Sequence, residues 1–493
     1  MTCVLALDQG TTGSTALVLD QDGTVLGRGY REVPQSFPEP GWVEHDPEAL
    51  FHTVCEAARE AMTQAGARPA AVGITNQRET VVLWERETLR PVAPAIVWQD
   101  RRTAERCRAL RSDGSADGIR RRTGLMVDPY FSATKIEWLL RAPGLLRRAA
   151  RGELAVGTVD AWLVARLTNG AVHVTDHTNA SRTMLYRLDR KEWDPELLSL
   201  FGVPSEILPK VVSSSGVVGE AAPEHLGRAM PIAGLVGDQQ GAMVGQGCVT
   251  KGSAKNTYGT GAFLLVHAGD VLPRPGEGLL ATVVCDAQGR PTYGLEGSLF
   301  IAGAAVQWLR DGLGIIRTAA ETDALARSVP DSGGVAFVPA FVGLGSPHWE
   351  PEARGTITGL TRGTTRAHLA RATLESMAFG SRDLLHAMTG RGDQLHPTAF
   401  RVDGGAAAND WLMQFQADIL DLVVERPANI ETTAVGAGVL AGLVLGLWPS
   451  VEEFARDVPL DRFEPRMDSA ERERRLAEWA RAVETALVWA RGE

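Results

Sequence analysis

One segment design occurs twice in this chain of 493 residues. A short apolar stretch at residues 4–7 leads into Asp8 and a turn rich in glycine and threonine. In the second half, the segment KNTYGTGAFLLV at residues 255–266 again combines a polar residue, a Thr/Gly turn and an apolar strand. Internal repetition of this kind predicts two related structural units. We therefore expect two domains, residues 1–248 and 249–493, with a cleft between them.

Strand and helix signals alternate along the chain. Asp46 followed by Pro47 is a typical helix start, because an aspartate at the N-cap accepts backbone hydrogen bonds and proline suits the first helical position. Alternation of this kind favours an α/β chain with mixed sheets over a helical bundle or a β-sandwich. The first predicted elements are three short strands, a helix and a further strand, at residues 4–7, 16–19, 24–27, 46–65 and 71–75.

Charge and cysteine usage exclude several classes of protein. The formal net charge is −10 and the pI is about 5.6, which argues against a nucleic-acid partner, since phosphate backbones need a concentrated basic surface. The five cysteines form no CxxC pair, and we expect no secretory signal before Asp8. The most apolar run, residues 434–448, is shorter than the roughly 20 residues of a spanning helix. We expect a cytoplasmic protein without membrane insertion, and a buried helix at that run.

Three glycine-rich turns are candidate anion sites. The turn at residues 10–15 could line a concave site with its backbone NH groups and hydroxyls, although an ordinary hairpin capped by Asp8 would have the same sequence. The turn at residues 258–261 has the same ambiguity, but two facing turns could bind one phosphate chain. A third turn, at residues 401–406, follows a strand and is expected to open a helix that contains Asn409, although a tight turn with a purely structural role would have the same sequence.

Asp238 is the main catalytic candidate. It lies between glycines in the segment GDQQG, after an apolar stretch at residues 232–236 and close to the expected domain boundary. A hydroxyl that attacks phosphorus needs an acceptor for its proton, and an aspartate in a cleft can serve. The alternative is an aspartate that only caps the following helix.

A polar cluster follows the strand at residues 71–75, where open α/β sheets place their binding sites. Within it, Arg78 and Glu79 could hydrogen-bond neighbouring hydroxyls of a polyol, although a surface salt bridge is the alternative. Trp98 and Tyr130 could cover a carbon skeleton, although either could equally belong to the core.

We expect no metal site built only from protein ligands, because the cysteines form no CxxC pair. Mg²⁺ is therefore expected to arrive with a nucleotide and to be held by one or two carboxylates, for which Asp8 and Asp238 are the candidates. The chain also lacks GxxxxGK[ST] and the protein-kinase signatures.

Segments distributed along the whole chain carry a family resemblance. They are LDQGTT (7–12), PGWVEHDP (40–47), GITNQRET (73–80), AIVWQDRRTAE (95–105), DPYFSATKIEWLL (128–140), HVTDHTNASRTML (173–185), GDQQGA (237–242), KNTYGTGAF (255–263), QWLRD (307–311), RGTITGLTRG (354–363), RATLES (371–376) and RVDGGAAAND (401–410). With these segments the chain resembles the FGGY family of carbohydrate kinases along its whole length. The Arg-Glu pair of NQRE resembles the members that phosphorylate glycerol.

The resemblance implies an actin-like, ribonuclease H-like ATPase fold in two duplicated domains and transfer of phosphate from MgATP to glycerol, giving sn-glycerol 3-phosphate in glycerol catabolism. It implies a homo-oligomer, either a dimer or a tetramer. Asp238 would be the general base. The implied glycerol-binding residues are Arg78, Glu79, Trp98, Tyr130, Asp238, Gln239 and Phe263. The implied ATP-binding residues are Thr11, Thr12, Gly13, Thr15, Thr260, Gly303, Gln307, Gly405 and Asn409.

Two segments depart from the family pattern. Thr15 stands where the family commonly has an arginine that contacts phosphate, so a weaker KM for ATP is expected. Residues 221–230 lack the glycine-rich loop of relatives that respond to fructose bisphosphate, which makes that response doubtful. Two other functions stay open: a kinase for another polyol or ketose, and an actin-like ATP-binding protein that transfers no phosphate to a small molecule.

Overall fold

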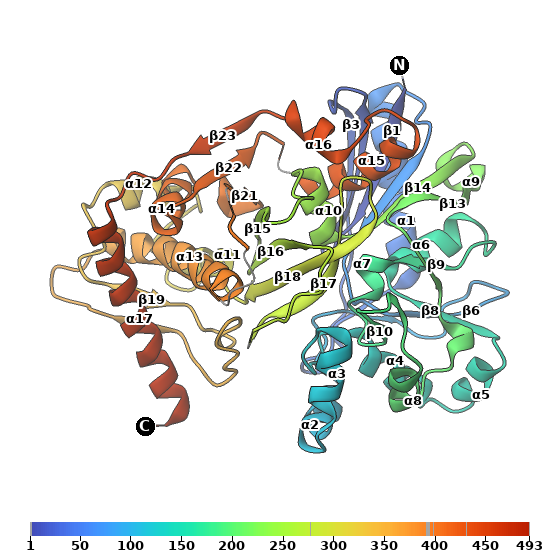
Figure 1. Ribbon diagram of the computed structural model, residues 1–493, viewed down its shortest axis with the longest axis horizontal. Helices are drawn as coiled ribbons and strands as arrows, with labels where there is room; N and C mark the ends of the chain where they lie inside the picture. Colours follow the sequence, from blue (N-terminus) through green and yellow to red (C-terminus); the bar gives the residue numbers. More distant parts are fainter. Residues whose placement is uncertain (1, 277, 391–394, 398, 430, 493) are drawn as a thin grey trace.

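Two mixed sheets form the framework of the computed structural model, which describes residues 2–276, 278–390, 395–397, 399–429 and 431–492 (Figure 1). The strand order of the first sheet is β13-β14-β5-β1-β2-β3. β1 runs parallel to β5, which runs parallel to β14, and the outer pairs are antiparallel. The strands are β1 Cys3–Gln9, β2 Gly13–Asp20, β3 Val25–Glu32, β5 Val72–Asn76, β13 Ser215–Ala221 and β14 Met230–Gly237.

The second sheet repeats this design. Its order is β17-β18-β16-β15-β21-β22-β23, with an antiparallel β15–β16 hairpin and β15, β21 and β22 running parallel. The strands are β15 Ala254–Tyr258, β16 Ala262–Gly269, β17 Leu280–Cys285, β18 Pro291–Leu299, β21 Ala399–Asp403, β22 Val423–Pro427 and β23 Leu460–Phe463. The expected α/β fold with a duplicated hairpin is confirmed.

The first predicted elements are present with small shifts of their ends. All three strands of the opening meander are longer than predicted, because cross-strand pairing extends beyond the apolar runs into the turns. The first helix, α1 Pro47–Ala65, begins as predicted: the Asp46 carboxylate accepts a hydrogen bond from the Glu48 N–H at 2.9 Å. Gly66, with φ of 57°, ends it.

The remaining elements surround the two sheets. The other helices of the first half are α2 Ala104–Ser112, α3 Ser115–Thr123, α4 Ser132–Leu140, α5 Leu145–Ala150, α6 Val159–Leu167, α7 His177–Ala180, α8 Pro195–Phe201, α9 Pro223–Leu226 and α10 Asp238–Gly245. Those of the second half are α11 Gly303–Asp311, α12 Glu321–Arg327, α13 Arg366–Thr389, α14 Asp410–Leu420, α15 Thr432–Val444, α16 Val451–Arg456 and α17 Ser469–Arg491. Short strands are β4 Glu44–His45, β6 Val82–Glu85, β7 Ala95–Ile96, β8 Leu154–Gly157, β9 Val174–Asp176, β10 Tyr186–Arg187, β11 Glu192–Trp193, β12 Lys210–Val212, β19 Ala336–Val338 and β20 Thr356–Thr358.

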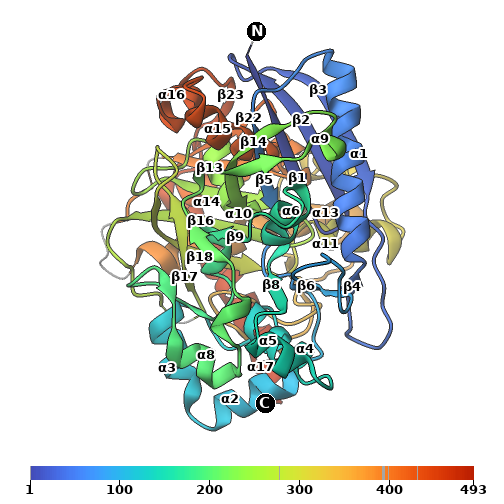
Figure 2. The same cartoon turned by 90° about the vertical axis from the view of Figure 1, so that its right-hand side faces the viewer.

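Helix α15 joins the two halves of the chain. It is the buried helix expected in residues 434–448, and although it belongs to the second half it packs on β1, β5 and β14 of the first sheet (Figures 1 and 2). Its backbone touches that of α10: a Cβ on Gly436 would collide with the carbonyl of Gly241. Trp448, expected at the end of this helix, lies beyond it and packs against Phe454. None of the helices within the described ranges combines the length and the apolar character needed to cross a bilayer.

Candidate active site

Three parallel strands of the first sheet end at the same level. Gln9 of β1 and Gly237 of β14 are both register partners of Asn76 in β5. The residues that follow these strands are the first glycine-rich turn, the Arg78–Glu79 pair and Asp238. The sheet therefore brings together three segments that are far apart in the sequence, at the edge where such sheets bind ligands.

The two predicted phosphate turns have similar hydrogen bonds. In the β1–β2 turn, the Gly10 N–H donates to the Gly13 carbonyl at 2.9 Å, and Thr12 is exposed at the tip. In the β15–β16 turn, the Gly259 N–H donates to the Gly261 carbonyl at 2.8 Å, and Thr260 is exposed. Each turn therefore presents a solvent-facing threonine beside backbone that can approach an anion closely.

Thr15, the position at which the family commonly has arginine, lies within β2 and is almost fully buried. Its register partner on β3 is Tyr30. The Tyr30 ring also covers Gly13, where an added Cβ would come within 2.5 Å of the ring. The turn is thus braced on this side by an aromatic side chain.

A cavity of about 660 Å³ lies beside the second turn. Gly404 requires glycine here, because its φ is 85° and a Cβ would collide with the Tyr258 carbonyl. The turn is held against the start of α11, where the Ala302 N–H donates to the Thr260 carbonyl at 2.8 Å. All five residues predicted for the second half of the nucleotide site line this cavity: Thr260, Gly303, Gln307, Gly405 and Asn409.

Asn409 differs in detail from the sequence-based expectation. It does not lie inside a helix that opens at the glycine turn, because a 3₁₀ turn, Gly405–Ala408, comes between. Asn409 instead caps α14, and its Oδ1 accepts from the Leu412 N–H at 2.9 Å. Its Nδ2 donates to Thr322 Oγ1 at 3.1 Å. The cap fixes the side chain at the wall of the cavity.

Asp238 is the first residue of α10, immediately after β14. Its Oδ1 lies 3.0 Å from Arg78 Nε and accepts a hydrogen bond from the Gln239 N–H at 2.6 Å. The Asp238 side chain is 31 % exposed, whereas Arg78 is 2 % exposed. Asp238 therefore accepts a backbone hydrogen bond at the start of α10, as a capping residue would. Its carboxylate is also partly exposed to solvent next to the buried Arg78.

Asp8 is the second carboxylate at this edge. Burial raises its pKa well above the usual range, and the charges of Asp238 and Glu431 add to the rise. Among the described residues, none donates a hydrogen bond to the Asp8 side chain, and no group of three or more His, Cys, Asp or Glu residues forms a metal cage. Asp8 and Asp238 repel each other beside a phosphate turn, and carboxylate oxygens are ligands that Mg²⁺ prefers. The two residues therefore fit a magnesium site.

The Arg78–Glu79 pair follows β5 and is buried. Glu79 has a φ of 61°, unusual for a residue with a side chain and a feature that clusters at functional sites. Burial raises the Glu79 pKa, an effect opposed by the positive charges of Arg78 and Arg182. The interpretation of this pair as a surface salt bridge is excluded, since both side chains are 2 % exposed.

Aromatic side chains connect the first turn to the polar pair. Trp98 Nε1 donates to Thr11 Oγ1 at 2.9 Å. The Trp98 ring meets Tyr130 edge to face, with centroids 5.5 Å apart. Burial raises the Tyr130 pKa, so the phenol stays neutral. Phe263 lies on β16, between the second turn and the small core cluster around Met243.

Three buried charged residues of this site were not predicted. Lys255 Nζ donates to Gln239 Oε1 at 2.6 Å, Glu296 accepts from Arg78 at 2.7 Å, and Arg182 donates to Glu79 at 2.7 Å. Lys255 and Arg182 fall in segments that carry the family resemblance, which was the signal available for them. Glu296 lies in an otherwise ordinary strand and had no such signal.

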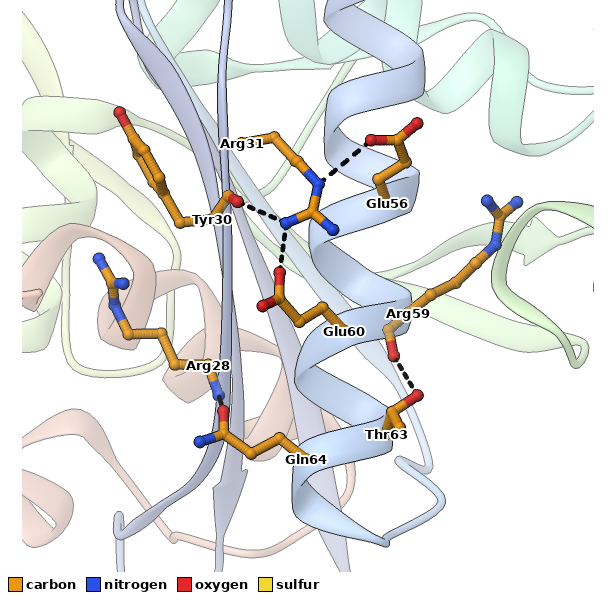
Figure 3. Close-up of a pocket in the computed structure, with 8 residues that line it drawn as sticks. All are labelled: Arg28, Tyr30, Arg31, Glu56, Arg59, Glu60, Thr63 and Gln64. Carbon is orange, nitrogen blue, oxygen red and sulfur yellow. Dashed lines mark hydrogen bonds and ion pairs between the residues drawn. The ribbon is translucent and has the colours of Figure 1, made fainter.

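A larger hollow, of about 750 Å³, lies elsewhere, at the edge between β3 and α1 (Figure 3). Its charged residues already have partners: Arg31 pairs with Glu56 and Glu60, and Arg28 pairs with Glu431. Figure 3 shows Arg31 directed at the helix and Tyr30 directed away from it. This hollow holds none of the predicted site residues.

The family matches cover most of the chain. Residues 3–245 match the N-terminal domain, and residues 254–445 the C-terminal domain, of the FGGY family of carbohydrate kinases. The protein belongs to this family.

Its relatives are similar over their full length. A glycerol kinase of Aromatoleum aromaticum is 57 % identical, with 99 % of each chain covered. A glycerol kinase of Rhodospirillum centenum is 54 % identical over 98 % of this chain and 97 % of the relative. The crystal structure of Plasmodium falciparum glycerol kinase with ADP superimposes with a TM-score of 0.93 at 34 % identity, covering 99 % of this chain and 98 % of that one.

Proposed function

We propose that the protein is an ATP-dependent glycerol kinase that forms sn-glycerol 3-phosphate. The observation that carries the proposal is the arrangement of Arg78, Glu79 and Asp238 at one edge of the first sheet, beside a phosphate turn. A cation, a buried carboxylate and a solvent-facing carboxylate offer both donors and acceptors to neighbouring hydroxyls. The full-length identity to proteins named glycerol kinase supports this substrate.

Glycerol would bind among Arg78, Glu79 and Gln239, with Tyr130, Trp98 and Phe263 against its carbons. The aromatic contact between Trp98 and Tyr130 and the hydrogen bond from Trp98 to Thr11 place this wall next to the phosphate turn. Such proximity supports transfer between the two ligands, because phosphoryl transfer depends on alignment more than on covalent chemistry.

Asp238 would act as the general base. It accepts the proton of a terminal glycerol hydroxyl as the oxygen attacks the γ-phosphorus in line and ADP leaves. Arg78, at 3.0 Å, keeps the Asp238 carboxylate in place. The backbone NH groups of both turns, with Thr11, Thr12, Gly13 and Thr260, would take up charge on the phosphoryl oxygens. Thr15 would support the first turn from within β2.

Asp8 and Asp238 would hold the Mg²⁺ that accompanies ATP. When bound, Mg²⁺ neutralises charge on the phosphates. Gly303, Gln307, Gly405 and Asn409 would hold the adenosine in the 660 Å³ cavity. We further propose a domain division after residue 248, assembly into a dimer or tetramer, and a role in glycerol catabolism in the cytoplasm.

The test is to identify the product. The protein is incubated with MgATP and glycerol, and the product is offered to a dehydrogenase that oxidises only sn-glycerol 3-phosphate. Stoichiometric NADH formation supports the proposal. ADP release without this product would reject it.

A further inference from the structure

We propose that Glu296 and Arg182 form a positioning pair, through which the second sheet holds the polyol-binding side chains of the first sheet in place. This inference rests on the proposed function. Neither residue is expected to touch the substrate. Their role follows from the contacts that each makes behind the site.

Glu296 binds two arginines with its two carboxylate oxygens. Its Oε2 accepts from Arg78 Nη1 at 2.7 Å, and its Oε1 accepts from Arg78 Nη2 at 3.1 Å and from Arg182 Nη2 at 2.9 Å. A bidentate pair of this kind fixes the plane of a guanidinium as well as its position. With its Nη atoms held by Glu296, Arg78 turns its Nε toward Asp238.

Arg182 contacts the rest of the pocket. Its Nε donates to Glu79 Oε1 at 2.7 Å, and its guanidinium lies 5.6 Å from the centre of the Tyr130 ring. The pair therefore contacts three predicted substrate residues directly, Arg78, Glu79 and Tyr130. It reaches a fourth, Asp238, through Arg78.

Burial makes these contacts costly to break. Arg182 is fully buried and the Glu296 side chain is 1 % exposed. Although burial alone would raise the pKa of Glu296, the charges of Arg182 and Arg78 lower it to about 2, so the carboxylate is ionised at neutral pH. Removing one partner from such a network leaves the other charges buried without compensation and free to take new positions.

The pair also joins the two halves of the chain. Glu296 lies on β18 and is the register partner of Leu265 on β16, which in turn is the register partner of Lys255 on β15. The Lys255 Nζ donates a hydrogen bond to Gln239 Oε1. Arg182 follows α7 in the first half of the chain. The polyol site is therefore complete only when the second sheet is seated against the first, whereas the adenosine cavity is lined by the second half alone.

The experiment measures KM for glycerol and for MgATP separately in Glu296→Gln and Arg182→Lys. Glutamine keeps the shape of Glu296 without its charge. Lysine keeps the charge of Arg182 without its planar guanidinium group. We expect each variant to raise the KM for glycerol by about tenfold or more, since hydrogen bonds to charged groups are lost. The KM for MgATP should change by less than about twofold.

Glu375→Gln is the matched control. Glu375 is also a buried glutamate that accepts from two arginines, Arg371 at 3.0 Å and Arg475 at 3.1 Å, but it lies in α13 outside the site. It should leave both KM values unchanged. The double variant of Glu296 and Arg182 should raise the glycerol KM by about as much as one single variant, because the two residues act as a unit.

This inference alone would be overturned if the wild-type enzyme is active but the Glu296→Gln and Arg182→Lys variants behave like the control. The same conclusion would follow if these variants raise both KM values equally. Multiplicative effects in the double variant would also overturn it. A wild-type protein that transfers no phosphate to glycerol would overturn the proposed function, and this inference with it.

Discussion

At the scale of single residues, the site depends on carboxylates kept in different environments. Both aspartates are partly exposed, but Asp238 lies against the Arg78 guanidinium, whereas Asp8 is repelled by the negative charges of Asp238 and Glu431. A base must be accessible to the proton that it accepts. A bound cation stabilises a carboxylate most where the charge of that carboxylate is otherwise unfavourable. Asp238 therefore suits the role of base, and both aspartates can contribute to holding the cation.

Asp238→Asn should lower kcat by about 10³-fold, because the amide cannot accept the hydroxyl proton. The melting temperature should stay within a few degrees of the wild-type value, since asparagine can still hydrogen-bond the Gln239 N–H. Coupled ADP release measures the rate. Asp468→Asn makes the same chemical change at the N-cap of α17 and should leave kcat unchanged. Near-normal turnover of the Asp238 variant would remove this residue from the role of base.

Asp8→Asn should raise stability while abolishing turnover. The folded-state pKa of Asp8 is raised, so the stability due to its protonated form is fully present below the unfolded pKa, near 4, and is lost as pH rises through the folded pKa. At pH 8 the variant should melt higher than the wild type by about 2 °C or more. The difference should vanish as the pH approaches 4. A variant that melts lower than the wild type at pH 8 contradicts this account of Asp8.

Sequence patterns could predict only part of the site. Asp238 and Arg78 each follow an apolar strand, which is a local signal. The roles of Glu296 and Arg182 arise from contacts between residues separated by 218 and 114 positions along the chain. No periodicity or spacing within a segment encodes such contacts, and a glutamate in a strand is by itself an ordinary surface pattern.

At the scale of elements, the contact between α10 and α15 determines where Asp238 lies. Gly241 and Gly245 of α10 face Gly436 and Thr432 of α15 with backbones in direct contact. The glycine-rich sequence of α15 predicted a buried, closely packed helix, and that is confirmed. Its partner could not be predicted, because a helix that is apolar on all sides indicates burial without indicating which surface it meets.

Gly436→Ala should therefore push the two helices apart. We expect a loss of about 1–3 kcal/mol in the free energy of unfolding, together with a lower kcat, because α10 carries Asp238. Urea unfolding and ADP release measure the two effects. The control is Gly118→Ala in α3, where the nearest atom to the added Cβ is 4.0 Å away, and it should stabilise by up to about 1 kcal/mol. Unchanged stability and turnover in Gly436→Ala would show that the contact is not tight.

At the scale of the whole molecule, the two sheets repeat one topology, and residues of both halves meet at the predicted polyol site, where Arg78 pairs with Glu296. The duplication was predictable from the two Thr/Gly hairpins, because they join equivalent strands in the two sheets, β1 with β2 and β15 with β16. The contacts by which α15 and Glu296 join the two halves were not predictable, because they depend on how the folded halves pack against each other. The boundary after residue 248 stays a prediction.

Glycerol and a non-hydrolysable MgATP analogue should stabilise the protein cooperatively. Each ligand at about 100 times its Kd should add about 2.7 kcal/mol, and the two together should add more than the sum, because one ligand seats the sheets for the other. Thermal unfolding with each ligand and with both measures this. Strict additivity would indicate that the sites do not communicate.

The most direct measurement is coupled ADP release with MgATP and, in parallel, glycerol, xylulose, gluconate, erythritol or no acceptor. The account predicts strong turnover with glycerol and little with the others, because Arg78, Glu79 and Asp238 are arranged for a small polyol. Turnover on another acceptor with none on glycerol would contradict the assigned substrate. ADP release that does not depend on any acceptor would contradict the kinase assignment itself.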